Sequence, residues 1–262
     1  MGDTQVGQAS WPVHLSEAGR AAEIGFVSEF RIVPAVRSPL ATGANGTVKR
    51  VFDIVAALLL VIPAIPVAVV IALAIALETR GPVLFAHTRI GAGQRPFRLW
   101  KFRSMRQDAE AALDRYLALH PELSAEWWAR HKLKNDPRMT RVGRWLRRTS
   151  LDELPQLWNV LRGDMSMVGP RPIVRAEVPK YGPAFGLYEC VRPGLTGLWQ
   201  VSGRTDLSYR GRVVCDTQYI RHWDLALDFK ILWLTVRNVF TRHGISAEGE
   251  ATMPRFRGTN RQ

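Results

Sequence analysis

An unbroken run of 24 apolar residues, from Ile54 to Leu77, dominates the first third of this 262-residue chain. A helix of that length measures about 36 Å, and the hydrocarbon core of a bilayer is about 30 Å thick. The run contains no charged side chain. Its length and composition therefore predict a membrane segment, and the simplest form of that segment is a helix that spans the bilayer.

Two features of this run argue against a single span. Pro63 and Pro66 lie near its middle, where each proline removes a backbone donor and kinks a helix. Both flanks are basic, with Lys49 and Arg50 before the run and, after it, Arg80, Arg89, Arg95, Arg98, Lys101 and Arg103. Because Lys and Arg mark the cytoplasmic flanks of membrane helices, both ends are expected in the cytoplasm. We predict a re-entrant helix over residues 48–80 that breaks at the prolines and returns.

The whole chain is strongly basic. It carries 36 Lys and Arg residues against 23 Asp and Glu, a formal net charge of +13. This excess predicts an anionic partner, which charge alone leaves open between nucleic acid, an acidic membrane surface and phosphorylated small molecules. An apolar content of 47% suffices for a packed core and argues against a disordered chain. Cys190 and Cys215 lack metal-site spacing and fit a reducing compartment.

Composition divides the chain into four parts. Residues 1–47 mix Gly, Ala, Ser and Pro, and we expect an irregular lead-in without a secretory signal. Residues 48–80 form the membrane segment, 81–250 a membrane-associated cytoplasmic domain and 251–262 a tail. The predicted fold class is α+β and mainly helical, with a re-entrant membrane helix, amphipathic interfacial helices and a small cytoplasmic domain.

Apolar periodicity predicts the helices of the cytoplasmic domain. They cover residues 108–119, 124–133, 157–161, 209–221 and 225–240. Gly163 is expected to end the third of them. The last has a broad apolar face, which suits a helix lying in the membrane interface, with a buried core helix as the alternative. Between helices, residues 81–85 are expected to form a short strand or turn, and residues 191–200 a loop with a strand-like end.

A cluster of charges near residue 150 points to phosphate chemistry. Asp152 and Glu153 follow Arg147 and Arg148, and Arg171 lies further on between two prolines. The planar guanidinium of arginine matches phosphate oxygens, and the flanking prolines hold the Arg171 backbone extended. A carboxylate can act as nucleophile, base or ligand of a divalent metal. The combination predicts a site that handles phosphate groups.

The backbone around the carboxylates admits two interpretations. Ser150 followed by Glu153 fits the capping box of a helix start. Pro155, however, would then fall inside the helix and remove one of its hydrogen bonds. The proline favours a helix that starts later, with Asp152 and Glu153 on the turn before it, where both can reach one centre.

Several ordered motifs resemble the bacterial sugar transferase family, the monotopic polyprenyl-phosphate phosphoglycosyl transferases that begin exopolysaccharide and glycan assembly. They are residues 134–138, Ser150-Leu151-Asp152-Glu153-Leu154-Pro155-Gln156-Leu157, Val168-Gly169-Pro170-Arg171-Pro172 and residues 192–204. The resemblance runs from about Lys49 to about Gly249. It also implies the re-entrant helix, and Pro66 falls at the position of the family's break proline, although Ile65 replaces a common serine.

The resemblance implies an enzyme whose cytoplasmic domain is catalytic, at the cytoplasmic face of the bacterial inner membrane. Its donor would be a UDP-sugar and its acceptor undecaprenyl phosphate, with no nucleic acid partner and a possible homodimer. Asp152 would be the nucleophile of a covalent route, with Glu153 beside it. The residues expected to bind phosphates or substrate are Arg147, Arg171, Lys101, Arg103, Arg192, Gln200 and Arg204.

Two questions stay open from the residues alone. Direct attack of the lipid phosphate on the donor would need only arginines and a metal, whereas the covalent route needs a carboxylate nucleophile. The scarcity of His and Cys clusters favours Mg²⁺ as cofactor, held by one carboxylate, such as Asp152, and by phosphate oxygens. The non-enzymatic alternative is a single-span protein that binds anionic lipid or nucleic acid and has no need of Asp152.

Overall fold

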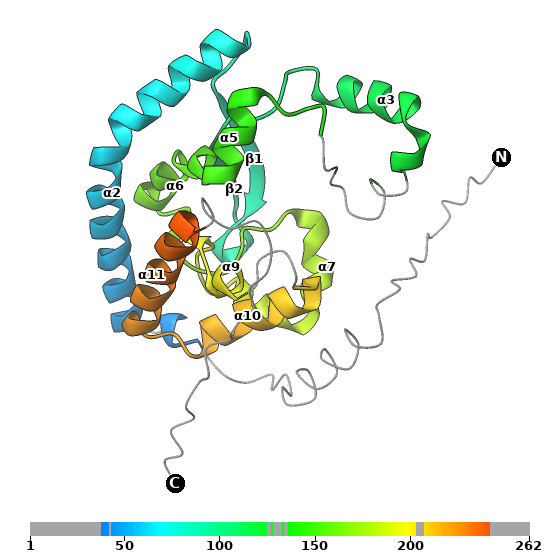
Figure 1. The fold of residues 1–262 in the computed structure, drawn as a ribbon. Helices are drawn as coiled ribbons and strands as arrows, with labels where there is room; N and C mark the ends of the chain where they lie inside the picture. Colours follow the sequence, from blue (N-terminus) through cyan, green and yellow to red (C-terminus); the bar gives the residue numbers. More distant parts are fainter. Residues whose placement is uncertain are drawn as a thin grey trace, which may run out of the picture. The chain divides into compact units, whose positions relative to one another are not determined.

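Our computed structural model describes residues 38–41, 43–124, 127, 133, 136–202 and 207–241. Its longest element is a bent helix, α2. The helix runs from Gly43 to Glu78 without interruption, and Pro63 and Pro66 lie inside it. Figure 1 shows α2 curving along one side of the other helices. The predicted break is therefore a bend, because a proline removes one hydrogen bond and tilts the axis while the flanking turns stay helical.

Most of α2 is exposed between its two ends. Among the described residues, it is the one helix long and apolar enough to cross a membrane. Ala57, Ile71 and Ile75 are buried against the other helices. The exposed apolar side chains include Leu58, Leu59, Leu60, Ile62, Ile65, Val67, Val69, Val70 and Leu73. Such a surface is unfavourable in water and points to an apolar environment outside the protein.

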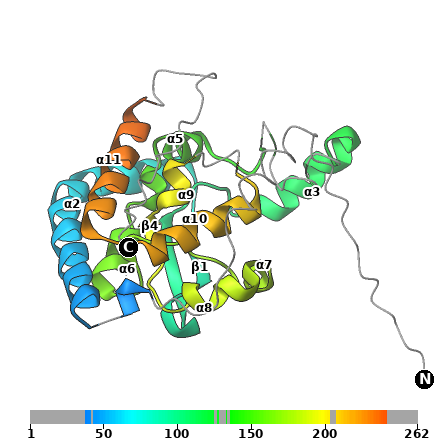
Figure 2. The same ribbon diagram turned by 90° about the horizontal axis from the view of Figure 1, so that it is seen from below.

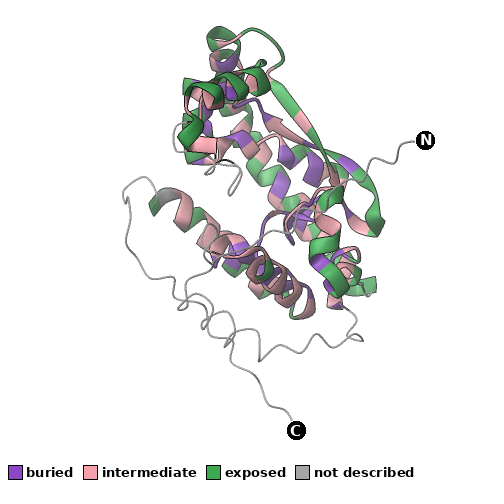
Figure 3. Ribbon diagram, turned by 90° about the vertical axis from the view of Figure 1, so that its right-hand side faces the viewer, coloured by how far each residue is buried: buried purple, intermediate pink, exposed green. Residues whose placement is uncertain are grey.

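A β-hairpin follows α2. Strand β1 (Leu84–Ile90) pairs in antiparallel fashion with β2 (Pro96–Phe102), and the short turn η2 (Ala92–Gln94) connects them. Side chains alternate across a strand, so Phe97 and Leu99 of β2 enter the core. Most of β1 is exposed, and exposed residues are green in Figure 3. The strand or turn predicted for residues 81–85 is thus the start of a longer hairpin.

Helices form most of the remaining fold, as predicted. The longer ones are α3 (Ala109–Leu119), α5 (Arg141–Thr149), α6 (Gln156–Arg162), α10 (Tyr209–Arg221) and α11 (Leu225–Thr241). The short ones are η1 (Pro39–Ala41), η3 (Pro121–Leu123), η4 (Leu151–Glu153), η5 (Arg175–Glu177), α7 (Val178–Tyr181), η6 (Gly182–Ala184), α8 (Phe185–Tyr188) and α9 (Leu198–Val201). Most of the helix predicted at 124–133, together with residues 1–37 and the tail 251–262, lies outside the described residues.

Two short strands cross the centre of the fold. Strand β3 (Ser166–Val168) pairs in parallel with β4 (Gly194–Thr196). Gly169 and Gly194 approach each other so closely that a side chain on either would collide with backbone. The segment 191–200 therefore contains a strand in its middle and the helix α9 at its end, whereas the sequence suggested a strand-like end. The main core packs α6, β3, α9, α10 and α11 together, with Ala57 of α2.

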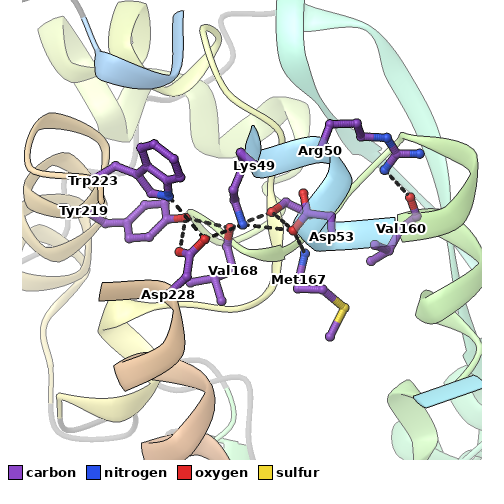
Figure 4. Close-up of polar contacts among 10 residues, drawn as sticks. Lys49, Arg50, Asp53, Val160, Met167, Val168, Tyr219, Trp223 and Asp228 are labelled. Carbon is purple, nitrogen blue, oxygen red and sulfur yellow. Dashed lines mark hydrogen bonds and ion pairs between the residues drawn. The ribbon is translucent and has the colours of Figure 1, made fainter. Parts of the chain in front are cut away.

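A buried ionic network attaches the first turns of α2 to the centre of the fold (Figure 4). Lys49 Nζ lies 2.9 Å from Asp53 Oδ1 and 2.8 Å from Asp228 Oδ2 of α11. Neutral donors complete the network: Ser166 Oγ and Met167 N donate to Asp53, and Tyr219 Oη and Trp223 Nε1 donate to Asp228. Figures 1 and 2 both show α11 running beside α2 at this end. Arg50 adds hydrogen bonds to the last carbonyls of α6.

The other end of α2 is also attached. Ile71 and Ile75 pack with Phe102 and Leu146 in a small apolar cluster. The Glu78 carboxylate accepts hydrogen bonds from the first backbone N–H groups of α5, at 2.6 and 3.0 Å. A carboxylate in this position satisfies orphan donors and complements the helix dipole. Both ends of α2 are thus bound to the same compact unit.

Candidate active site

The two carboxylates lie on a tight turn between helices α5 and α6. Helix α5 ends at Ser150, whose φ of 59° is left-handed and unusual for a non-glycine residue. One 3₁₀ turn, η4, then carries Asp152 and Glu153, and α6 starts after Pro155. Ser150 makes no side-chain cap. The prediction that the helix begins after the proline, with both carboxylates on the preceding turn, is confirmed.

Lys101 of β2 gives the two carboxylates different environments. Its Nζ lies 2.7 Å from Glu153 Oε1 and 3.8 Å from Asp152 Oδ2. Asp152 is buried, with 7% of its surface exposed. Burial raises the pKa of Asp152 above its ordinary value, while the charges of Lys101 and Arg147 act in the opposite direction. Glu153 is therefore a paired carboxylate, and Asp152 is a buried one whose charge is only partly offset.

Three arginines from distant parts of the chain gather next to this turn. Arg171 and Arg212 stack on Trp199, with guanidinium carbons 5.2 and 4.7 Å from the ring centroid. Burial and the nearby charge of Arg171 lower the pKa values of Arg89 and Arg212. The Nε atoms of all three arginines and the indole Nε1 are buried and have no hydrogen-bond partner among the described residues. Such unused donors with like charges favour an anion between them.

The buried carboxylate of Asp216 holds Arg171 of the arginine cluster in place. Asp216 Oδ2 accepts hydrogen bonds from Tyr181 Oη at 2.7 Å and from the backbone N of Arg171 at 3.4 Å. Burial raises the pKa of Asp216 to about 7. The hydrogen bond to its backbone fixes Arg171, whose conformation Pro170 and Pro172 already restrict.

The structure brings four of the predicted substrate-binding residues together. Lys101, Arg171 and Gln200 line a small cavity of about 50 Å³ with Glu153, and Arg89 and Trp199 also line it. Arg147 lies one turn before the carboxylates, and its Nε donates to Ser104 Oγ at 3.1 Å. Its charge also lowers the pKa of Asp152, which places its influence at the site.

Two other predicted residues, Arg103 and Arg192, do not line this cavity. Arg103 follows the end of β2 and donates to the carbonyls of Thr79 and Arg80 at 2.9 Å, so it is held at the end of α2. Arg192 is exposed and donates to the carbonyl of Gly163, near the other end of α2. Arg204 lies outside the described residues. Arginine forks satisfy carbonyls as readily as phosphates, and the sequence does not distinguish these roles.

The sequence analysis missed four residues of the site: Arg89, Trp199, Arg212 and Asp216. Arg89 was predicted only as a flanking cation, and Asp216 fell within the predicted helix 209–221 without a role of its own. Trp199 falls inside the family motif at residues 192–204, which could have identified it as a site residue. Arg89 and Arg212 had no such signal, because 82 and 41 residues respectively separate them from Arg171 (171 − 89 and 212 − 171).

The carboxylate oxygens of this site could hold a divalent metal only together with phosphate oxygens of a substrate. Among the described residues, no group of three or more His, Cys, Asp or Glu side chains could enclose a metal ion. Asp152 and Glu153 are adjacent oxygen donors, and Mg²⁺ is commonly held by one or two carboxylates plus phosphate oxygens and water. The incomplete charge compensation of Asp152 is consistent with this arrangement.

Comparison with known proteins identifies the family. The profile described as "Bacterial sugar transferase" matches residues 44–242, which include α2, the carboxylate turn and the arginine cluster. The chain belongs to the bacterial sugar transferase family. The resemblance noted in the sequence motifs is thereby confirmed.

Relatives within this sugar transferase family carry related names. The chain is 44% identical to the undecaprenyl-phosphate galactose phosphotransferase of Salmonella typhimurium, over 80% of this chain and 44% of that protein. It is 41% identical to the UDP-glucose:undecaprenyl-phosphate glucose-1-phosphate transferase of Escherichia coli, over 78% and 42%. The exopolysaccharide production protein ExoY of Rhizobium meliloti is 43% identical, over 79% and 93%. The chain thus spans less than half of the first two relatives and nearly all of ExoY.

Proposed function

We propose that this chain transfers a hexose-1-phosphate from a UDP-sugar to undecaprenyl phosphate and releases UMP. This would be the first membrane step of exopolysaccharide or glycan assembly. The names of its relatives support the substrate classes. The observation that carries the proposal is the buried Asp152 near Lys101, on a turn whose Glu153 lines a cavity with Arg89 and Arg171. The Nε donors of Arg89, Arg171 and Arg212 are unused.

The chemistry divides into two displacements at one phosphorus atom. Asp152 Oδ attacks the β-phosphorus of the donor, and the bond to the bridging oxygen breaks, so that UMP leaves with the electron pair. A phosphate oxygen of the lipid then attacks the same phosphorus, the bond to Asp152 breaks, and the carboxylate is restored. This covalent route splits one difficult step into two.

The cations have separate tasks in this scheme. Arg171, with Arg89 and Arg212, would bind the phosphate that leaves with UMP, because its charge is largest once the bond has broken. Lys101 holds Glu153 in place and offsets the charge of Asp152 before the attack. Asp152, with phosphate oxygens of the donor, would hold Mg²⁺, which supplies charge neutralisation between an anionic nucleophile and an anionic substrate.

The fold supports the predicted re-entrant topology at the cytoplasmic face of the inner membrane. Both ends of α2 are bound to the same compact unit, through Lys49 at one end and Glu78 at the other. A helix that crossed the bilayer would place its two ends, and therefore two parts of this one unit, on opposite sides of the membrane. Exposed aromatic side chains on α5, α6 and α11 fit the membrane interface; they are Trp145, Trp158, Phe229 and Trp233.

The decisive experiment measures UMP release from UDP-sugar without acceptor lipid. Asp152→Asn keeps the shape of the side chain and removes the nucleophile, so the single-turnover burst of UMP should disappear. Asp114→Asn, the same change on the exposed surface of α3, is the control and should keep the burst. Excess chelator should suppress the burst in the unchanged chain. A full burst from Asp152→Asn would make Glu153 the candidate nucleophile, and full turnover in chelator would exclude Mg²⁺.

A further inference from the structure

A second and much larger cavity lies on another side of the carboxylate turn. It encloses about 390 Å³ between α2, α11 and η4. Leu60 of α2 and Leu232, Val236 and Val239 of α11 supply aliphatic walls. Leu60 and Val236 are each about half exposed, so the cavity continues into the exposed apolar surface of α2. It therefore opens toward the part of the protein that we assign to the membrane.

Arg148, Ser150, Glu153, Gln200 and Asn238 supply polar groups to this cavity, but its aliphatic walls disfavour a polar ligand. Its threonine hydroxyls are already used inside the protein. Thr235 Oγ1 donates to the Ile231 carbonyl and lies 2.7 Å from Thr196 Oγ1, which leaves Thr196 as the donor between them. Thr149 Oγ1 donates within its own helix. A sugar or nucleotide would lose its hydrogen bonds to water along these walls without replacement, whereas a hydrocarbon chain would not.

One end of the same cavity reaches the chemistry. Glu153 and Gln200 line both this cavity and the small one beside Arg171. Arg148, exposed on α5, lines only the larger cavity and supplies a cation at the carboxylate turn. An amphiphile with its chain along the aliphatic walls would therefore bring an anionic head group to Arg148 and Glu153, next to Asp152 in the chain.

We propose that this cavity binds the phosphate-proximal isoprene units of the acceptor lipid. The inference rests on the proposed function and deepens it. The two substrates then approach the carboxylate turn, at Glu153, through different cavities: the nucleotide sugar beside the arginines, and the lipid between α2 and α11. The volume lies at the lower end of the range of small-molecule sites, about 300–1,000 Å³, so only the first part of a long polyprenyl chain fits. The remainder would lie along exposed α2 in the bilayer.

Filling the cavity tests this assignment. The probe is a polyprenyl phosphate that carries a diazirine in its first isoprene unit, applied to the full chain in lipid nanodiscs. Photolabel should appear on α2 and α11, and undecaprenyl phosphate should compete for it. Val236→Trp and Leu60→Trp, which fill the cavity from opposite walls, should each reduce labelling and phosphosugar transfer by about tenfold, a change of about 1.4 kcal/mol in binding. Thr241→Trp, on the exposed end of α11, is the matched control and should label like the unchanged chain.

Each contrary result has a distinct meaning. Labelling that phosphatidylglycerol suppresses as well as undecaprenyl phosphate does would identify a bulk-lipid cavity and overturn the proposal. Undiminished labelling and transfer in both tryptophan variants would also overturn it. UMP release from the donor alone, measured in the same preparations, reports whether each variant is folded. Because photolabelling needs no turnover, it tests the lipid cavity even if Asp152 fails as nucleophile.

Discussion

Asp152 and Glu153 are adjacent carboxylates, but Lys101 gives them different electrostatic environments. Lys101 pairs closely with Glu153 and only distantly with Asp152. Burial then raises the pKa of Asp152, which makes its carboxylate more basic and more nucleophilic than an ordinary aspartate. A raised pKa also means that the ionised, reactive form is lost as pH falls, at a higher pH than for a solvent-exposed aspartate.

Replacing Lys101 by Met should move the acid limb of the UMP-release rate to higher pH. The positive charge of Lys101 lowers the pKa of Asp152, so its removal raises that pKa further and leaves less carboxylate ionised at a given pH. A pH–rate profile of the donor-only reaction measures the shift. Lys180→Met, an exposed lysine beside Tyr209, should leave the limb in place. An acid limb at the same pH in Lys101→Met and in the unchanged chain would contradict this electrostatic role.

Helix α2 combines an apolar middle with charged ends, and its charges determine where it is attached. Lys49 is buried between Asp53 and Asp228 and joins α2 to α11. α11 was predicted to lie in the membrane interface or in the core. Its Ile231 is buried in the core, and its Trp233 is exposed. The network thus fixes the first turns of α2 against a helix that also lines the larger, mainly apolar cavity.

Replacing Lys49 by Met should destabilise the protein strongly. The change leaves Asp53 and Asp228 buried without their shared cation, and breaking a buried ion pair in this way costs roughly 3–5 kcal/mol. Thermal unfolding in detergent should show a Tm lower by several degrees or more. Lys230→Met, the same substitution at an exposed position of α11, is the matched control. Adding Asp228→Asn should recover part of the loss, and an unchanged Tm for Lys49→Met would show that the network contributes little.

In the whole molecule, one compact unit holds the long apolar helix α2 at both ends. This arrangement predicts that the two ends of α2 lie on one side of the membrane. It also places the carboxylate turn between a polar cavity with arginines and an apolar cavity between α2 and α11. A reaction between a soluble nucleotide sugar and a membrane lipid requires a site with access to both environments.

Cysteine labelling in intact cells tests the topology. Asn45→Cys places an exposed thiol in the first turn of α2 and Pro82→Cys places one after its end, in a background where Cys190 and Cys215 are serine. A membrane-impermeant maleimide added outside should label neither site, and permeabilised cells should label both. Labelling of either site from outside would establish a span and refute the re-entrant helix.

Local features were predictable from the residues themselves. Helix α10 matches its predicted range, α11 and α6 match within a few residues, and Gly163 ends α6 with a φ of 90°. Pro155 correctly moved the helix start beyond the carboxylates. These features follow from side-chain periodicity and backbone restrictions that act over a few residues. The motifs around Asp152 and Arg171 likewise indicated the family from short stretches of sequence.

Long-range pairing depended on the folded chain. The β1–β2 hairpin brings Lys101 to Glu153, and three distant segments bring Arg89, Arg171 and Arg212 to Trp199. Nothing local marks Arg103 as a helix cap or Arg89 as a site residue, since both are arginines in a basic segment. Their partners are set by the packing of the whole core, because contacts between distant segments form only where the combined burial of many side chains outweighs the lost chain entropy.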